Sequence, residues 1–152
     1  MKFCVINTET SKVWDPITFF HMFAAPLSLP DDEWTECRIA AGEPLPADVA
    51  DFRGLIITGS HYNVAEDLPW CLPLRQCIMQ AAARGSPKIF GACYGCQFVA
   101  QALGGVVAPN PSGEFILLNE AMRLVVDHST FAQRMCCNPD DSSNMFAEKA
   151  DP

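Results

Sequence analysis

Basic side chains are scarce in this sequence. Its 152 residues include 10 Lys and Arg against 18 Asp and Glu, which gives a formal net charge of -8. A surface of this sign repels the phosphate backbone, and no basic stripe interrupts it. Nucleic acids and anionic lipid surfaces are therefore not expected as partners.

Long apolar runs are lacking as well. No stretch approaches the roughly 20 apolar residues needed to span a membrane, and the run that follows Met1 is shorter than the core of a signal peptide. Hydrophobic residues still make up 49% of the chain and charged residues 18%. We therefore expect one globular domain with a single core, a cytoplasmic location and no membrane partner.

The eight cysteines do not indicate a disulfide-stapled secreted domain, because no secretory signal precedes them and the apolar side chains suffice for a core. Cys4 and Cys37 lie in apolar, strand-like runs, and Cys71 and Cys77 lie in a predicted helix. A free cysteine in such a position behaves as a small hydrophobic side chain. We expect these four thiols to be reduced and to belong to the core.

Continuous apolar segments alternate with amphipathic segments along the chain. The apolar segments predict buried strands at 2–7, 34–39, 54–58 and 88–91. The amphipathic segments predict helices at 15–25, 72–83 and 95–103, ended by proline or glycine. Shorter strand-like runs follow at 106–107, 115–118 and 122–126. This order predicts an α/β fold of three layers, a mostly parallel sheet with helices on both faces.

Cys93 lies at the junction of a predicted strand and a predicted helix, where open α/β sheets bind ligands. Gly91 and Gly95 stand two residues before and after it. This spacing lets a nucleophile elbow reverse direction without Cβ clashes. The unpaired N–H groups and the dipole at the start of the helix favour a thiolate. The pattern predicts that Cys93 is an exposed nucleophile.

Backbone N–H groups beside such a nucleophile can also stabilise an oxyanion. Tyr94 is the first expected donor, because its N–H opens the predicted helix. The second donor is expected from Gly59, in the Gly59-Ser60 turn that ends the neighbouring predicted strand.

The segment from Phe90 to Gly105 resembles the nucleophile segment of the class I glutamine amidotransferases, and the segment from Leu55 to Ser60 resembles their oxyanion strand. The likeness extends over residues 1–134. It is closest to stand-alone members similar to the amidotransferase domain of GMP synthase and to plant γ-glutamyl peptidases. The resemblance implies a flavodoxin-like fold, with Ser60, Gln97 and Phe115 in contact with substrate.

In this family a cysteine thiolate attacks the side-chain amide of glutamine or a γ-glutamyl bond, and water then cleaves a γ-glutamyl thioester. The resemblance therefore implies a small-molecule substrate, no cofactor and no metal. No nucleotide-binding loop or synthetase segment is visible. Ammonia would pass to a separate acceptor protein, or hydrolysis would be the whole reaction.

The family also uses a catalytic His, oriented by a Glu, in a late His-x-Glu motif, and this sequence contains no such motif. Its histidines are His21, His61 and His128. We expect a structural, partly exposed role for His21, and a pocket position without a base role for His61. Because the likeness ends near Met135, we expect an incomplete, truncated domain at 1–134 that lacks C-terminal strands, a disordered tail at 135–152, and slow turnover.

Three alternatives stay open. Cys93 and Cys96 form a C-x-x-C motif at a helix start, as in thioredoxin-like redox proteins, although that interpretation gives the flanking glycines no role. Together with Cys136 and Cys137 they could bind zinc, although adjacent cysteines are poorly spaced as ligands. The missing His and Glu also fit a non-catalytic binding or regulatory protein that keeps the amidotransferase fold.

Overall fold

The computed structural model describes residues 1–14, 19–109 and 113. The chain before Ser112 forms one compact unit. Its described residues contain a parallel sheet in the order β2-β1-β3-β4, made of strands β1 Lys2–Ile6, β2 Glu33–Cys37, β3 Gly54–Ile57 and β4 Lys88–Gly91. The helices are α1 Phe19–Leu27, α2 Cys71–Arg84 and α3 Tyr94–Ala102, with short 3-10 turns η1 Lys12–Trp14, η2 Ile39–Ala41 and η3 Val49–Asp51.

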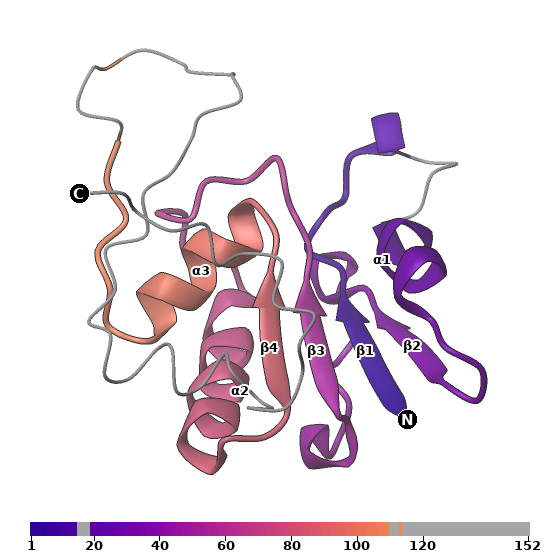
Figure 1. Cartoon of the computed structure of the whole chain (residues 1–152). Coiled ribbons are helices and arrows are strands. Elements are labelled where there is room, and N and C mark those ends of the chain that lie inside the picture. The colour runs from indigo at the N-terminus through magenta and orange to yellow at the C-terminus, as the bar shows by residue number, and fades with distance from the viewer. Residues whose placement is uncertain (15–18, 110–112, 114–152) are drawn as a thin grey trace, which may run out of the picture. The chain divides into compact units, whose positions relative to one another are not determined.

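One face of the sheet packs against α2 and α3. Successive side chains of a strand point to opposite faces of the sheet, so Cys4 and Ile6 of β1 share one face, and so do Leu55 and Ile57 of β3. They join a core cluster with buried side chains of both helices, among them Leu74, Ile78 and Phe98. In Figure 1, α2 and α3 accordingly lie beside β4.

The opposite face packs against α1. Val5, Ile56 and Phe90 are in register across β1, β3 and β4, and their side chains point away from the first cluster. Phe23 of α1 meets Phe90 edge to face, with ring centroids 6.4 Å apart. Helices therefore cover both faces, which confirms the predicted three-layer α/β fold.

Each strand and helix predicted before residue 104 is present. The strand at 88–91 has the predicted bounds and the other elements have shifted ends, while residues 15–18 of the first predicted helix lie outside the described residues. Pro26 was expected to end α1, but the helix continues to Leu27. It does so because the next donor, the Ser28 N–H, still reaches the carbonyl oxygen of Ala24 at 2.9 Å. Proline removes only its own hydrogen bond, which costs little in the last turn.

The strand predicted at 106–107 is wrong. This segment is irregular, and Val106 is 91% exposed. Two apolar residues without a ladder partner cannot offset the loss of conformational entropy. The runs at 115–118 and 122–126, and the tail at 135–152, lie outside the described residues.

The four core thiols are confirmed, since Cys4, Cys37, Cys71 and Cys77 are free and buried. None of the described helices has the length and apolar character required to cross a membrane.

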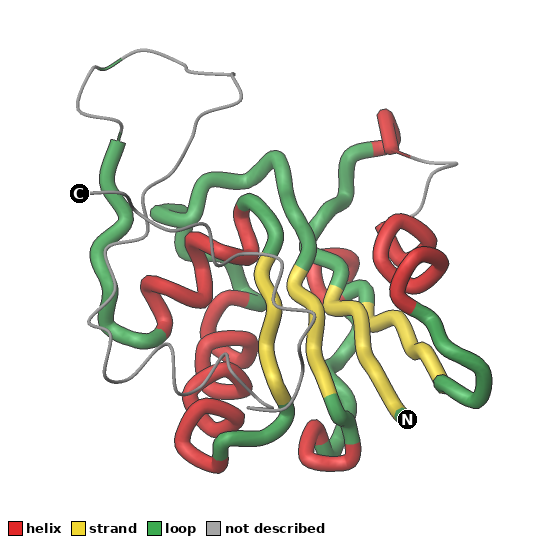
Figure 2. Tube along the Cα trace, in the orientation of Figure 1, coloured by secondary structure: helices red, strands yellow, loops and turns green. Residues whose placement is uncertain are grey.

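All four strands run in the same direction, so the loops after β1, β3 and β4 leave the sheet at one edge (Figure 2). That edge carries the candidate site.

Candidate active site

Cys93 occupies the turn between β4 and α3, and its side chain is exposed. Its backbone has φ 50° and ψ -111°, one of two positive φ values among the described residues other than glycine. A side chain in this conformation is strained, and such strain is typical of the sharp turn that presents a nucleophile at the top of an α/β sheet. The predicted exposure of Cys93 on an elbow is thus present in the structure.

Gly91 and Gly95 permit this turn through close backbone contacts. A Cβ on Gly91 would lie 2.5 Å from the Cys96 nitrogen, and a Cβ on Gly95 would lie 2.8 Å from the Ile57 carbonyl carbon. Real Cβ atoms do not approach backbone so closely. Both glycines are therefore required by packing, as the spacing predicted.

The elbow is fixed to the end of β3 by backbone hydrogen bonds. The Ala92 N–H donates to the Ile57 carbonyl oxygen at 2.9 Å, and the Gly95 N–H donates to the Thr58 carbonyl oxygen at 3.1 Å. As a result, a Cβ built on Gly59 would lie 3.5 Å from the Cβ of Cys93. The turn after β3 and the cysteine are direct neighbours.

Two backbone donors remain for a ligand beside the thiol. Among the described residues, neither the Gly59 nor the Tyr94 backbone N–H donates a hydrogen bond to the protein. Both belong to segments that contact each other at the elbow. This arrangement suits the stabilisation of an oxyanion on a group bonded to the Cys93 sulfur.

The expected substrate contacts are brought together only in part. The Ser60 hydroxyl donates to the Thr8 carbonyl oxygen at 2.6 Å and accepts from the Tyr62 N–H at 3.3 Å, so this side chain is engaged by the protein framework. The Gln97 side chain is exposed on α3, and the Gln97 backbone N–H donates to the Cys93 carbonyl oxygen at 3.2 Å. Phe115 lies outside the described residues.

The side chain of Tyr94 supports the elbow from below. It is buried, stacks on Phe98 with centroids 5.7 Å apart, and meets Trp70 at 5.8 Å. Burial, together with the nearby Cys71 thiol, raises the pKa of the Tyr94 phenol well above its usual range. The phenol therefore stays protonated at neutral pH and acts as packing.

Cys96 is exposed on the first turn of α3. The described residues contain no group of three or more His, Cys, Asp or Glu side chains placed to hold a metal ion. Cys136 and Cys137, the other two thiols of the zinc alternative, lie outside the described residues.

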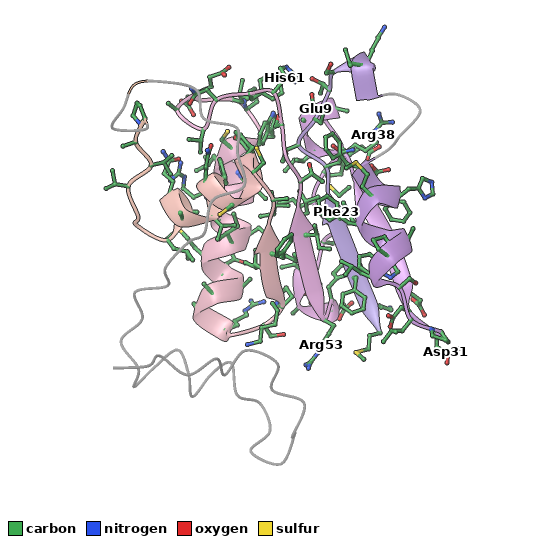
Figure 3. All side chains as sticks on the ribbon, turned by 45° about the horizontal axis from the view of Figure 1, so that its top comes forward. Glu9, Phe23, Asp31, Arg38, Arg53 and His61 are labelled. Atoms are coloured by element: carbon green, nitrogen blue, oxygen red, sulfur yellow. The ribbon has the colours of Figure 1, made fainter. Side chains whose placement is uncertain are left out.

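Glu9 and its pairing with His61 were not predicted from the sequence, although His61 was expected at the pocket. Glu9, just after β1, has a buried carboxylate that hydrogen-bonds the Nδ1 of His61 and accepts the His61 backbone N–H at 2.8 Å. Figure 3 shows the two residues together at the edge from which the strands exit. The sequence signal was a polar run, residues 7–11, directly after a buried strand. His21, by contrast, is exposed and contacts the Phe20 ring, as expected.

Hydrogen bonds favour the ionised form of the Glu9 carboxylate in spite of its burial. Burial alone raises the pKa of Glu9, but hydrogen bonds from the Ser11 and Thr10 N–H groups and from His61 outweigh it, so the net pKa is lowered. A carboxylate that accepts several N–H groups is stabilised in its charged form. Glu9 thus holds a fixed negative charge beside His61.

Sequence and structure comparisons agree on the relatives of this chain. Gamma-glutamyl peptidase 4 of Arabidopsis thaliana is 30% identical over 101 residues, which cover 66% of this chain and 40% of that protein. The glutamine-hydrolysing GMP synthase of Porphyromonas gingivalis is 32% identical over 81 residues, covering 53% and 15%. The crystal structure of a glutamine amidotransferase from Methylobacillus flagellatus superposes with a TM-score of 0.55 and 28% identity, covering 72% and 41%. No protein-family model matches.

The elbow, the parallel sheet and these relatives define one class of protein. The chain is similar to the class I glutamine amidotransferases and shares their flavodoxin-like fold. It spans less than half the length of the relatives named above.

Proposed function

We propose that Cys93 is the nucleophile of a site that acts on the side-chain amide of glutamine or on a γ-glutamyl bond. The observation that carries this proposal is the strained turn that exposes Cys93 directly beside Gly59. Nucleophilic catalysis by cysteine needs an accessible thiol and donors for the oxyanion, and this turn supplies both.

The proposed chemistry proceeds in two steps. The Cys93 thiolate adds to the γ-carbonyl carbon, and the resulting oxyanion accepts the N–H groups of Gly59 and Tyr94. The carbon–nitrogen bond then breaks, and the leaving nitrogen takes up from water a proton equivalent to the one that the Cys93 thiol released, so that ammonia or an amine departs. Water adds to the γ-glutamyl thioester, the carbon–sulfur bond breaks, and glutamate and the free thiol are released.

The names of the relatives support the substrate class. One is a γ-glutamyl peptidase and another is a glutamine-hydrolysing synthase, and both names refer to the γ-carbonyl of a glutamyl group. On this basis we propose the amidotransferase-like domain at 1–134, the divergent segment at 135–152, and substrate contacts from Ser60, Gln97 and Phe115. We also propose that a separate protein accepts the ammonia, and that the protein is cytoplasmic.

The sequence has no His-x-Glu motif to accept the thiol proton and protonate the leaving nitrogen. We therefore propose that this polypeptide forms the thioester and turns over slowly. General acid–base catalysis typically contributes about 10²–10⁴-fold, and this is the expected deficit.

The test is covalent labelling with a diazoketone analogue of glutamine, followed by intact mass and peptide mapping. We expect one adduct on Cys93 whose formation is slowed by excess glutamine or a γ-glutamyl compound. The Cys93→Ala variant should form none, and the Cys96→Ser variant should label normally. If Cys93 stays unlabelled, or if competitors have no effect, the fold serves as a non-catalytic binding module instead.

A further inference from the structure

The turn that follows β3 is tied to the turn that follows β1 by a continuous set of hydrogen bonds. The Thr8 N–H donates to the Thr58 Oγ1 at 3.0 Å, and the Ser60 hydroxyl donates to the Thr8 carbonyl oxygen at 2.6 Å. Thr8 Oγ1 also donates to the Gly59 carbonyl oxygen at 3.2 Å. These contacts hold residues 58–60 from the side of β1.

Glu9 closes this set at its outer end. Its Oε1 accepts the N–H groups of Thr10 and Ser11 at 2.8 and 2.7 Å, which fixes the carboxylate to its own turn. Its Oε2 accepts the His61 N–H, and Oε1 also binds the His61 ring, across 52 positions of sequence. The carboxylate is thus a rigid anchor to which both the backbone and the side chain of His61 are attached.

His61, the residue held by this anchor, lies two positions after the candidate oxyanion donor, Gly59. Gly59 is the residue whose Cβ would approach the Cβ of Cys93 to 3.5 Å. Glycine has no side chain to hold its own peptide in place, so the orientation of the Gly59 N–H depends on the residues around it. The peptide group that carries this N–H includes the Thr58 carbonyl oxygen, which accepts the Gly95 N–H at 3.1 Å and the Thr8 hydroxyl at 3.2 Å. Glu9 holds the chain on the other side, through the backbone and the ring of His61.

Burying a carboxylate is costly unless the charge is paired and hydrogen-bonded. The Glu9 side chain is 4% exposed, whereas the His61 side chain is 48% exposed. A surface ion pair would place both groups in water and contribute little. Glu9 is buried, and each of its carboxylate oxygens is hydrogen-bonded to His61. This indicates that Glu9 fixes the turn after β3, rather than making a simple surface contact.

We propose that Glu9 is a positioning residue, which acts through His61 to hold the Gly59 N–H against the oxyanion formed at Cys93. The inference rests on the proposed function of Cys93. It adds a residue for which the sequence motifs of the elbow and the oxyanion strand give no indication. A displacement of about 1 Å at an oxyanion donor is enough to cost about 10²-fold in rate.

The experiment compares two reactions of the same thiol. γ-Glutamyl p-nitroanilide acylates Cys93 through a tetrahedral oxyanion and releases p-nitroaniline in a first-turnover burst. Iodoacetamide alkylates Cys93 by direct displacement at carbon, without an oxyanion. We expect Glu9→Gln to slow the burst by about 10²-fold and to leave alkylation of Cys93 unchanged.

Glu43→Gln is the matched control. Its carboxylate also accepts a backbone N–H, that of Arg38 at 2.7 Å, but it lies in an exposed turn after β2. This variant should retain both rates. If Glu9→Gln does not fold, as judged by far-UV circular dichroism, the same two rates are measured on the His61→Ala variant. In that variant Glu9 still accepts the N–H groups of Thr10 and Ser11.

The outcomes separate the two proposals. A wild-type protein without a burst or a Cys93 adduct refutes the proposed function. A wild-type burst that Glu9→Gln leaves unchanged overturns the positioning role and keeps the proposed function. Equal slowing of acylation and alkylation also overturns it, since a general loss of structure would affect both reactions.

Discussion

Gly95 lies so close to Ile57 that any Cβ at position 95 would meet the Ile57 carbonyl group. The first turn of α3 is therefore pressed against the end of β3, and the Gly95 N–H uses this proximity to donate to the Thr58 carbonyl oxygen at 3.1 Å. The contact fixes where the helix starts relative to the strand. It thereby fixes Cys93, two residues earlier, beside Gly59.

The Gly95→Ala substitution should separate α3 from β3. The clash is with backbone atoms, which cannot rotate away, so we expect a loss of about 1–3 kcal/mol in the free energy of unfolding. Urea denaturation followed by circular dichroism measures this loss. Gly85→Asn is the control, because Gly85 has φ 70° and nothing within 4 Å of its added Cβ, and Asn tolerates this conformation. Equal midpoints for the two variants would contradict the packing argument.

Thiol reactivity should divide the cysteines of the described chain into two groups. Burial raises the pKa of Cys4 to about 12 and that of Cys37 to about 11, while Cys93 and Cys96 are exposed. Alkylating reagents attack the thiolate, which the two buried residues do not form between pH 7 and 9. Pulsed iodoacetamide labelling with peptide mapping should therefore modify Cys93 and Cys96 first.

The same pulse in urea is the control, since it should label Cys4 and Cys37 as readily as the others. Native-state labelling of Cys4 at the rate of Cys93 would show that β1 is not buried as described.

The stability of the fold should depend on pH through Glu9. Its folded-state pKa is lowered from the ordinary value of 4.5, because hydrogen bonds to the carboxylate outweigh its burial. The unfolded chain therefore binds the proton more readily below pH 4.5. The stabilisation is fully present above that pH and is lost as the pH falls through the folded-state pKa.

Urea midpoints of the wild type and of Glu9→Gln at pH values from 7 to 3 measure this effect. The difference between the two proteins should shrink below pH 4.5. A difference that stays constant over the whole range would show that the Glu9 carboxylate is not ionised in the fold.

The sequence predicted the elbow well because its determinants are local. Gly91, Cys93 and Gly95 lie within five positions, and backbone sterics at such spacing follow from residue type alone. The Glu9–His61 pair could not be predicted in this way. The two residues are 52 positions apart, and they meet only because β1 and β3 are adjacent and parallel.

The strand predicted at 106–107 failed for a related reason. Two valines indicate a strand only if a neighbour offers them a ladder and an apolar surface. In the structure Val106 is 91% exposed, whereas Val5, with the same intrinsic preference, is fully buried between β2 and β3. Position in the sheet, which local composition does not contain, decided between them.

Phe98 should contribute more to the free energy of unfolding than an exposed apolar residue in α3 or directly after it. It is 1% exposed, packs between Tyr94 and Trp70, and carries the Arg75 guanidinium 5.6 Å above its ring. Phe98→Ala should cost about 3–5 kcal/mol, since it removes the ring and leaves a cavity below the elbow. Leu103→Ala is the control, because Leu103 is 54% exposed and a surface change of this kind alters stability by about 0.5 kcal/mol or less. Urea midpoints of the two variants test this directly, and a similar small loss in both would mean that the aromatic cluster does not support the turn that presents Cys93.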